Sequence, residues 1–305
     1  GKTMQKNSQL EEYECYSADV AQCSVEANWE NKGPDLKIGN DHVLANMIEA
    51  MLLGEKVPGL EPLRYSPDAI VMKLDEIGWP TATRLCAKTI YRYVELGVFS
   101  RVTIQDLPRK GVKPKRRRRR VEKRQRPPDC KRISERPAEC EDRSEPGHWE
   151  MDCIESAKGD NTCLLTLVDR KTRECIIFKL GRQTQEAVLR RINGLERKMG
   201  TKAFKEKFKT ITLDNGAEFL NWKKLEKSVF GDSERTAIYY AHSYSSWERG
   251  SGENLNGFVR YFIPKGTIIK NLREKEIKIL EEFINNYPRR ILGGVSAKNF
   301  LQAAA

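Results

Sequence analysis

The fold class of this chain is decided by the stretch GHWEMDCIESAKGDNTCLLTLVDRKTRECIIFKLG, residues 147–181. It contains three apolar segments, at 147–156, 161–172 and 173–181, and the connections between them are short and polar. Short apolar segments that are bounded by polar turns favour β-strands, and short connections favour strands that are neighbours in one sheet. Three consecutive strands are therefore predicted at the start of a domain.

After residue 181 the sequence alternates between strand and helix patterns. The segment TQEAVLRRINGLERKMG, residues 184–200, has apolar positions at helical spacing. The segments that follow predict a strand at 208–216, a short helix at 221–231, a strand at 235–242, and helices at 251–263 and 273–287. Three strands followed by strand–helix alternation is the order of the RNase H-like fold. We therefore predict an α/β domain at residues 147–305, with a five-stranded mixed sheet flanked by helices.

An all-α domain is predicted at residues 39–107. Apolar positions at helical spacing occur at 40–53, 66–78 and 87–99. The last of these helices would direct Lys88 and Arg92 outward, and its tight connection to the second helix is typical of a helix-turn-helix, which reads DNA in the major groove. Small helical bundles that do not bind DNA have the same pattern, so these residues alone leave both alternatives open.

Between the two predicted domains lies a concentrated basic tract, residues 109–136. It contains fifteen Lys/Arg against three Asp/Glu, a local net charge of +12 that equals the net charge of the whole chain. Such a run cannot fold alone, because like charges repel and no apolar face is available for burial. We predict that residues 108–146 form a proline-containing linker that contacts DNA phosphates, with a purely solvated linker as the alternative. The candidate contacts are Lys115, Arg116, Arg117, Arg118, Arg119 and Arg120.

The composition excludes several other classes of protein. No apolar run approaches the length of a membrane span and no signal-peptide pattern is present, so a cytoplasmic, nucleoid-associated protein is predicted. The eight cysteines form no CxxC pair, and only three histidines occur, so a metal site would depend on carboxylates and would favour magnesium or manganese. Residues 1–38 are polar and weakly periodic, and we expect this segment to be poorly structured or truncated.

Three carboxylates interrupt the apolar pattern of the predicted α/β domain. Asp152 lies within the first strand, Asp214 follows the apolar run before an Asn-Gly turn, and Glu253 begins a helix, whose dipole favours an ionised carboxylate. Singly, each is explained as a strand-edge, turn or helix-start residue. Together, in this strand–strand–helix order, they are predicted to be catalytic and to bind two Mg or Mn ions, because phosphodiester cleavage or transfer requires charge neutralisation at both the attacking and the leaving oxygen.

Several motifs make a family resemblance recognisable. They are GHWEMD, LTLVDRKTR, TITLDNGAEF, YYAHSYSSWERGSGENLNGFVRYFIPKGT and NNYPRRILGG. In these stretches, and more loosely in YSPDAI and KTIYRY, the chain resembles transposases of the insertion-sequence-thirty family, within the superfamily of DDE transposases and retroviral integrases. The resemblance covers most of residues 147–301. It implies metal-dependent strand cleavage at the ends of a mobile element, followed by attack of the freed 3′-hydroxyl on target DNA.

The resemblance assigns roles to individual residues. Asp152, Asp214 and Glu253 fall on the family's metal-binding triad, and Arg260, two helical turns beyond Glu253, resembles a basic residue that contacts DNA near the active site. From the residues alone, Trp247 is a candidate for stacking on an unpaired base and Arg249 for contacting a phosphate. Packing of Trp247 against the sheet and solvation of Arg260 are the alternatives.

The predicted partners are double-stranded DNA, both terminal repeats and target, and a second copy of the chain in a homodimer or higher oligomer on DNA. Two other classes of function are weighed against a transposase. A DNA-binding regulator or a domesticated relic would use the helix-turn-helix and the basic tract without catalysis. An RNase H-type nuclease would share the fold and the metal ions but would release its products without joining them.

Overall fold

The computed structural model describes the chain except for residues 1, 31–35, 61, 109–128, 243–244 and 305. It divides into two units, one formed by Gly1–Ala45 with Trp79–Leu85 and the other by Asn46–Gly78 with Cys86–Ala305. Among the described residues, no helix combines the length and the apolar character needed to cross a bilayer.

The first unit begins with a small hairpin. Strands β1 (Lys2–Lys6) and β2 (Glu12–Tyr16) are antiparallel, and helix α1 (Ala18–Glu30) follows them. The Asn7 side chain accepts hydrogen bonds from the backbone N–H groups of Gln9 and Glu11, which closes the turn. Secondary structure is thus present where we expected little, because local hydrogen bonds of this kind leave no signature in apolar periodicity.

Three helices, α2 (His42–Leu53), α3 (Pro67–Ile77) and α4 (Ala87–Glu95), occupy the segments for which helices were predicted. The Ser66 hydroxyl caps α3 by accepting from the Ala69 N–H at 3.3 Å, with Pro67 at the first helical position. Helix α4 buries Ile90, Tyr93 and Val94 and leaves its basic side chains exposed.

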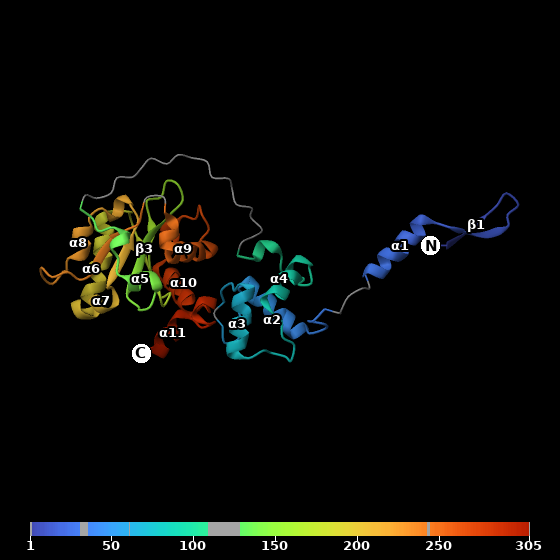
Figure 1. The fold of residues 1–305 in the computed structure, drawn as a ribbon, viewed down its shortest axis with the longest axis horizontal. Helices are drawn as coiled ribbons and strands as arrows, with labels where there is room; N and C mark the ends of the chain where they lie inside the picture. The colour runs from blue at the N-terminus through green and yellow to red at the C-terminus, as the bar shows by residue number, and fades with distance from the viewer. Residues whose placement is uncertain (1, 31–35, 61, 109–128, 243–244, 305) are drawn as a thin grey trace. The chain divides into compact units, whose positions relative to one another are not determined.

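The second unit contains a five-stranded mixed sheet in the order β5-β4-β3-β6-β7. Strand β3 of this sheet is labelled in Figure 1. Its strands are β3 (His148–Glu155), β4 (Cys163–Asp169), β5 (Cys175–Leu180), β6 (Thr210–Leu213) and β7 (Ala237–Tyr240). The first three form an antiparallel meander, whereas β6 pairs parallel to β3 and β7 pairs parallel to β6. The predicted α/β class with a five-stranded mixed sheet is confirmed.

Helices and short 3-10 turns connect and flank the strands. They are η1 (Ile104–Asp106), η2 (Ile133–Glu135), α5 (Ala138–Asp142), α6 (Gln185–Met199), α7 (Thr201–Lys207), η3 (Ala217–Phe219), α8 (Trp222–Glu226), η4 (Ser246–Arg249), α9 (Gly250–Phe262), η5 (Ile269–Asn271), α10 (Glu274–Asn286), η6 (Arg290–Leu292) and α11 (Ala297–Ala304). Within residues 108–146, predicted to be a proline-containing linker, Pro137 immediately precedes α5. Proline is compatible with a helix start, because the first residues of a helix need no N–H partner.

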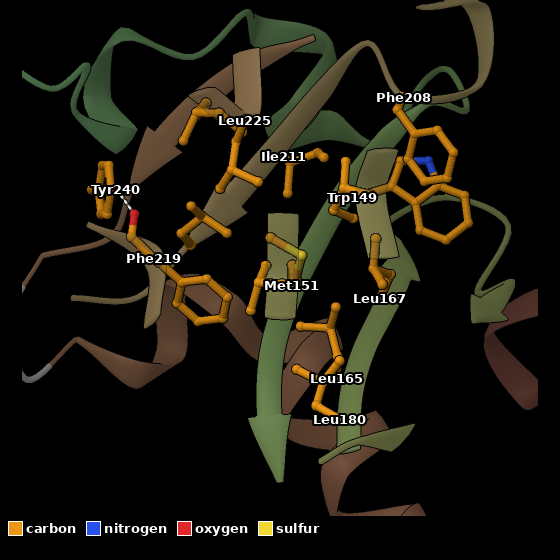
Figure 2. Packing of buried hydrophobic residues seen from close by; sticks show 14 of the residues in the cluster. Trp149, Met151, Leu165, Leu167, Leu180, Phe208, Ile211, Phe219, Leu225 and Tyr240 are labelled. Carbon is orange, nitrogen blue, oxygen red and sulfur yellow. Dashed lines mark hydrogen bonds between the residues drawn. The ribbon is translucent and has the colours of Figure 1, made fainter. Parts of the chain in front are cut away.

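The main core lies on one face of the sheet. Trp149 and Met151 of β3 and Ile211 of β6 point into it, and it is closed by apolar residues of α6 and α7 (Figure 2). Side chains alternate between the two faces of a strand, so the residues between these core positions face the other side. That other face is covered by α9 against β3 and β4, and by α10 against β5.

The end of the linker is attached to the edge of this sheet. Residue Arg132 forms a parallel bridge with Tyr240 of β7, and the Tyr240 N–H donates to the Lys131 carbonyl at 3.0 Å. Residues 129–146 therefore run from the outer strand towards the start of β3. The predicted contacts Lys115 to Arg120 lie outside the described residues.

Candidate active site

Asp152 and Asp214 lie side by side on the face of the sheet that is opposite to the main core. In the parallel pairing of β3 with β6, Glu150 is level with Thr212, so continuing the register by two residues places Asp152 beside Asp214. Adjacent strands are about 4.8 Å apart. The predicted strand-borne carboxylates are therefore neighbours in space, although 62 positions separate them in sequence.

A single cation, the Arg249 guanidinium, lies against both carboxylates. Its Nη1 is 3.2 Å from Asp152 Oδ2 and its Nη2 is 3.7 Å from Asp214 Oδ2. Arg249 is largely buried and is held at this position by η4, which leads directly into α9. In this structure Arg249 is the counter-ion of the carboxylate pair, and its contact with a DNA phosphate stays a prediction.

Asn256 is a further member of the site that the sequence analysis missed. Its Nδ2 donates to Asp152 Oδ2 at 2.9 Å, and its Oδ1 accepts from the Thr166 hydroxyl at 3.0 Å. Thr166 is the cross-strand partner of Asp152 on β4. No sequence pattern singles out Asn256, because its contact with Asp152 depends on the rotation of α9 about its axis.

The environment of Asp152 makes a nearby cation favourable. Burial is the main cause that raises the pKa of the Asp152 carboxyl; Arg249 acts in the opposite direction, and the charge of Asp214 adds to the increase. A buried pair of carboxylates needs a compensating positive charge to stay ionised. In this structure Arg249 supplies that charge.

Glu253 is not gathered with the two aspartates. It lies in the first turn of α9, as predicted, but its side chain is exposed and lines a cavity of about 870 Å³ together with Tyr261, Arg289 and Arg290. Within the described part of the chain, no group of three His, Cys, Asp or Glu side chains is arranged to hold a metal ion. Glu253 precedes Asn256 by three residues on α9, so the two side chains are about 60° apart around the helix axis. Glu253 therefore lies beside the helix face on which Asn256 contacts Asp152.

A second acidic residue, Glu218, lies close to Asp214. A Cβ placed on Gly216 would be 2.6 Å from Glu218 Oε2 and 2.8 Å from Asp214 Oδ1, so both carboxylates border this glycine. Glu218 is buried and accepts a hydrogen bond of 2.7 Å from Gln183 Nε2. The proximity of Glu218 to Asp214 depends on the conformation of the turn between them, which a separation of four residues does not determine.

The start of α9 is fixed by a buried carboxylate of β3. Glu150 accepts from the Gly252 N–H at 2.6 Å and from Arg170 Nη1 at 2.5 Å. Arg173 Nη1 also donates to the Ser251 hydroxyl at 2.5 Å. These contacts hold the N-terminal turn of α9, and with it Glu253, over the strand that carries the first aspartate.

Asp169 has a structural role at the end of β4. It accepts from the backbone N–H groups of Gly147, Lys171 and Thr172, and so closes the turn after the strand. The neighbouring Arg170 pairs with Glu150 and Glu141.

The remaining candidate DNA contacts differ in their surroundings. Trp247 is 74% exposed, so it does not pack the loop onto the sheet. Arg260 Nη2 donates to the Glu155 carbonyl at 2.6 Å, at the end of β3. Lys88 and Arg92 are exposed on α4.

The donor chemistry of the aspartate pair suits a divalent cation. Both ligands are carboxylates, which hard ions such as Mg²⁺ and Mn²⁺ prefer, and a cationic group already lies between them. Asp152 and Asp214 therefore fit such an ion. In this structure the Arg249 guanidinium supplies the positive charge beside them.

Comparison with known proteins identifies the type of domain that contains this site. A family model described as "Integrase core domain" matches residues 142–229. The match includes Asp152 and Asp214 and ends before α9. It also spans four of the five strands, β3 to β6. Most of the sheet and both aspartates therefore fall within one known type of domain.

Relatives of similar sequence extend over more of the chain. A "Probable transposase for insertion-like sequence element IS1161" from Streptococcus salivarius is 37% identical over 221 residues, which are 70% of this chain and 58% of that protein. The transposase of element IS1086 from Cupriavidus metallidurans is 27% identical over 91% of this chain and 77% of its own length. The transposase InsI of element IS30C from Escherichia coli is 30% identical over 56% of this chain and 42% of its own length. The matched region thus spans a little over half of the Streptococcus relative.

Proposed function

We propose that the chain is a transposase of the insertion-sequence-thirty (IS30) type, which binds the terminal repeats of a mobile element, cleaves DNA at their ends and joins the freed 3′-hydroxyl to target DNA. The observation that carries this proposal is the pair formed by Asp152 and Asp214. Two carboxylates on adjacent parallel strands, only partly neutralised by one buried cation, provide a site that would hold divalent cations against a phosphodiester.

We propose that Asp152, Asp214 and Glu253 hold two divalent ions, Mg²⁺ or Mn²⁺. Such ions, when bound, neutralise the charge that develops on the attacking and leaving oxygens of a phosphodiester. The aspartates contribute from the sheet, and Glu253 contributes from the first turn of α9, where the helix dipole stabilises its ionised form.

Other residues of the chain are proposed to position this set. Asn256 fixes the orientation of Asp152 through its 2.9 Å hydrogen bond, and Glu150 fixes the start of α9 through Gly252. A catalytic group that is held by a rigid strand and a rigid helix keeps its geometry without reorganisation, which is a main source of rate enhancement in transfer reactions.

DNA recognition is proposed to use regions outside the carboxylate site. The exposed Lys88 and Arg92 on α4 are candidates for contacts with the terminal repeat, and the basic tract of residues 109–136 for contacts with phosphates. Because a mobile element has two ends, we propose that the chain acts as a homodimer or higher oligomer on double-stranded DNA.

The proposal is tested with end-labelled DNA that carries the terminal repeats, in Mg²⁺ or Mn²⁺. Joining of the labelled strand to a target plasmid is expected when the cleaved end carries a 3′-hydroxyl, and no joining is expected when that end carries a 3′-deoxynucleotide. Cleavage without joining on either end would favour an RNase H-type nuclease. Tight binding of DNA without cleavage in either metal would favour a regulator or a relic.

A further inference from the structure

A second cavity lies next to the candidate active site, and its lining has the character of a nucleotide subsite. It has a volume of about 440 Å³ and is formed by residues 133–143, by Arg170 and by the segment around η4. Among the side chains that line it are Arg136, Arg143 and Trp247.

The walls of this cavity and the carboxylate pair are built from the same segments. Arg136 Nη1 donates to the Thr212 hydroxyl at 3.1 Å, and Thr212 precedes Asp214 by two residues on the same face of β6. Glu248 and Gly250 line the cavity and flank Arg249, which contacts both aspartates. A DNA strand whose phosphate reaches the carboxylates would therefore pass this cavity.

The basic groups of the cavity retain capacity for an anion. Arg136 pairs with Glu141 and Thr212, yet its buried Nε has no hydrogen-bond partner among the residues that the structure describes. Arg143 is half-buried and forms no ion pair with a carboxylate of the described chain. A phosphate oxygen is the acceptor that such guanidinium groups bind most strongly.

The acidic groups of the lining already have partners within the protein. Glu141 pairs with Arg136 and with Arg170. The Glu248 carboxylate accepts from the backbone N–H of His242 at 2.7 Å and lies 2.7 Å from its ring nitrogen Nδ1.

Trp247 supplies an apolar surface at the same cavity. Its side chain is 74% exposed, so the indole face is open to a ligand, and covering it would bury apolar surface. The face of an indole binds any nucleobase by stacking, but only a base that has left the duplex stack can offer its own face.

We propose that this cavity holds one unpaired nucleotide of the DNA that is being processed, with its base stacked on Trp247 and its phosphate bound by Arg143 and Arg136. The inference rests on the proposed function and goes beyond it, because it assigns a subsite and requires that the DNA be unpaired beside the carboxylates.

The test uses the full chain without divalent metal and two fluorescein-labelled duplexes of identical sequence. One duplex carries a single unpaired thymidine at its end, and the other carries an abasic residue at that position. In anisotropy titrations, Trp247→Ala is expected to weaken binding of the thymidine duplex by about 5- to 150-fold and to leave binding of the abasic duplex unchanged. Trp247→Phe should retain most of the affinity, and Phe230→Ala, which removes another well-exposed aromatic, should have no effect.

The phosphate contact is tested separately by salt dependence. Arg143→Gln is expected to reduce the slope of log K against log salt concentration by about 0.7–0.9, whereas Arg143→Lys should preserve it. An equal loss on both duplexes for Trp247→Ala, or no loss on either, would overturn the inference while leaving strand joining intact. Failure of the parent protein to bind either duplex would instead overturn the proposed function.

Discussion

Replacing Arg249 by glutamine should tighten the binding of divalent metal at the carboxylate pair. In the structure its guanidinium lies 3.2 Å from Asp152 and 3.7 Å from Asp214, so it occupies the region of positive charge that a metal ion would need. A metal ion must either displace this group or bind beside it, and both cost free energy. Removing the positive charge therefore favours the metal in either case.

The size of the effect follows from the two contacts. An exposed ion pair contributes up to about 1 kcal/mol, and a buried hydrogen bond to a charged group contributes up to about 3 kcal/mol. The Arg249 contacts lie between these limits, because the carboxylate side chains are 19% and 32% exposed. We expect Mn²⁺ to bind the glutamine variant about 5- to 150-fold more tightly, which corresponds to about 1–3 kcal/mol.

The assay is isothermal titration of the DNA-free protein with Mn²⁺, so that the result does not depend on catalysis. Arg249→Lys keeps the positive charge and should bind Mn²⁺ with nearly the affinity of the parent. Arg182→Gln, at an exposed arginine away from the pair, is the matched control for loss of one charge. Unchanged or weaker binding by Arg249→Gln, or equal tightening by Arg182→Gln, would refute the view of Arg249 as an internal counter-ion.

Three further predictions concern stability and the turn after β6. Glu196→Gln should lower the free energy of unfolding by about 3–5 kcal/mol in urea, because it leaves Arg235, its fully buried ion-pair partner, uncompensated; a loss within experimental error would contradict this. Burial acts to raise the pKa of Glu196, but hydrogen bonds from Ser228, Val229 and Arg235 outweigh it and lower the pKa below its ordinary value of 4.5. The stability advantage of the parent over Glu196→Gln should therefore be complete above about pH 4.5 and shrink as the pH falls through the lower folded value, and urea titrations across this range that show no change would exclude it. Gly216→Ala should reduce strand joining by about 100-fold with unchanged DNA binding, because its Cβ would collide with the carboxylates of Asp214 and Glu218; a normal joining rate would show that these carboxylates can move apart freely.

The sheet and the aspartate pair were predictable from the sequence because they depend on local patterns. Alternation along β3 and β6 places Asp152 and Asp214 on the face away from the core, and parallel strand order then makes them neighbours. Each of these steps uses residues within one strand or the order of strands.

The other members of the site depend on tertiary contacts and could not be predicted in the same way. Arg249 and Glu218 could each have faced solvent, and only the packing of η4 and of the turn after β6 brings them to the aspartates. For Glu253 and Asn256, helical spacing cannot decide which side chain of α9 meets Asp152, because the rotation of the helix is fixed by Glu150 on another element. The hairpin at residues 2–16 was missed for a related reason, since its strands are mostly exposed and carry no apolar alternation.

The central claim is that three carboxylates act together in DNA strand transfer, and it is tested most directly by strand joining with single-residue variants. Asp152→Asn, Asp214→Asn and Glu253→Gln would be compared with the parent and with Glu155→Gln, an exposed acidic control at the end of β3. We expect each of the three to lose joining by about a thousandfold while DNA binding is retained, because a metal ligand contributes several kcal/mol to the transition state. The control should join DNA normally. Normal joining by Glu253→Gln would show that Glu253 does not act with the two aspartates. Normal joining by either aspartate variant would contradict the central claim.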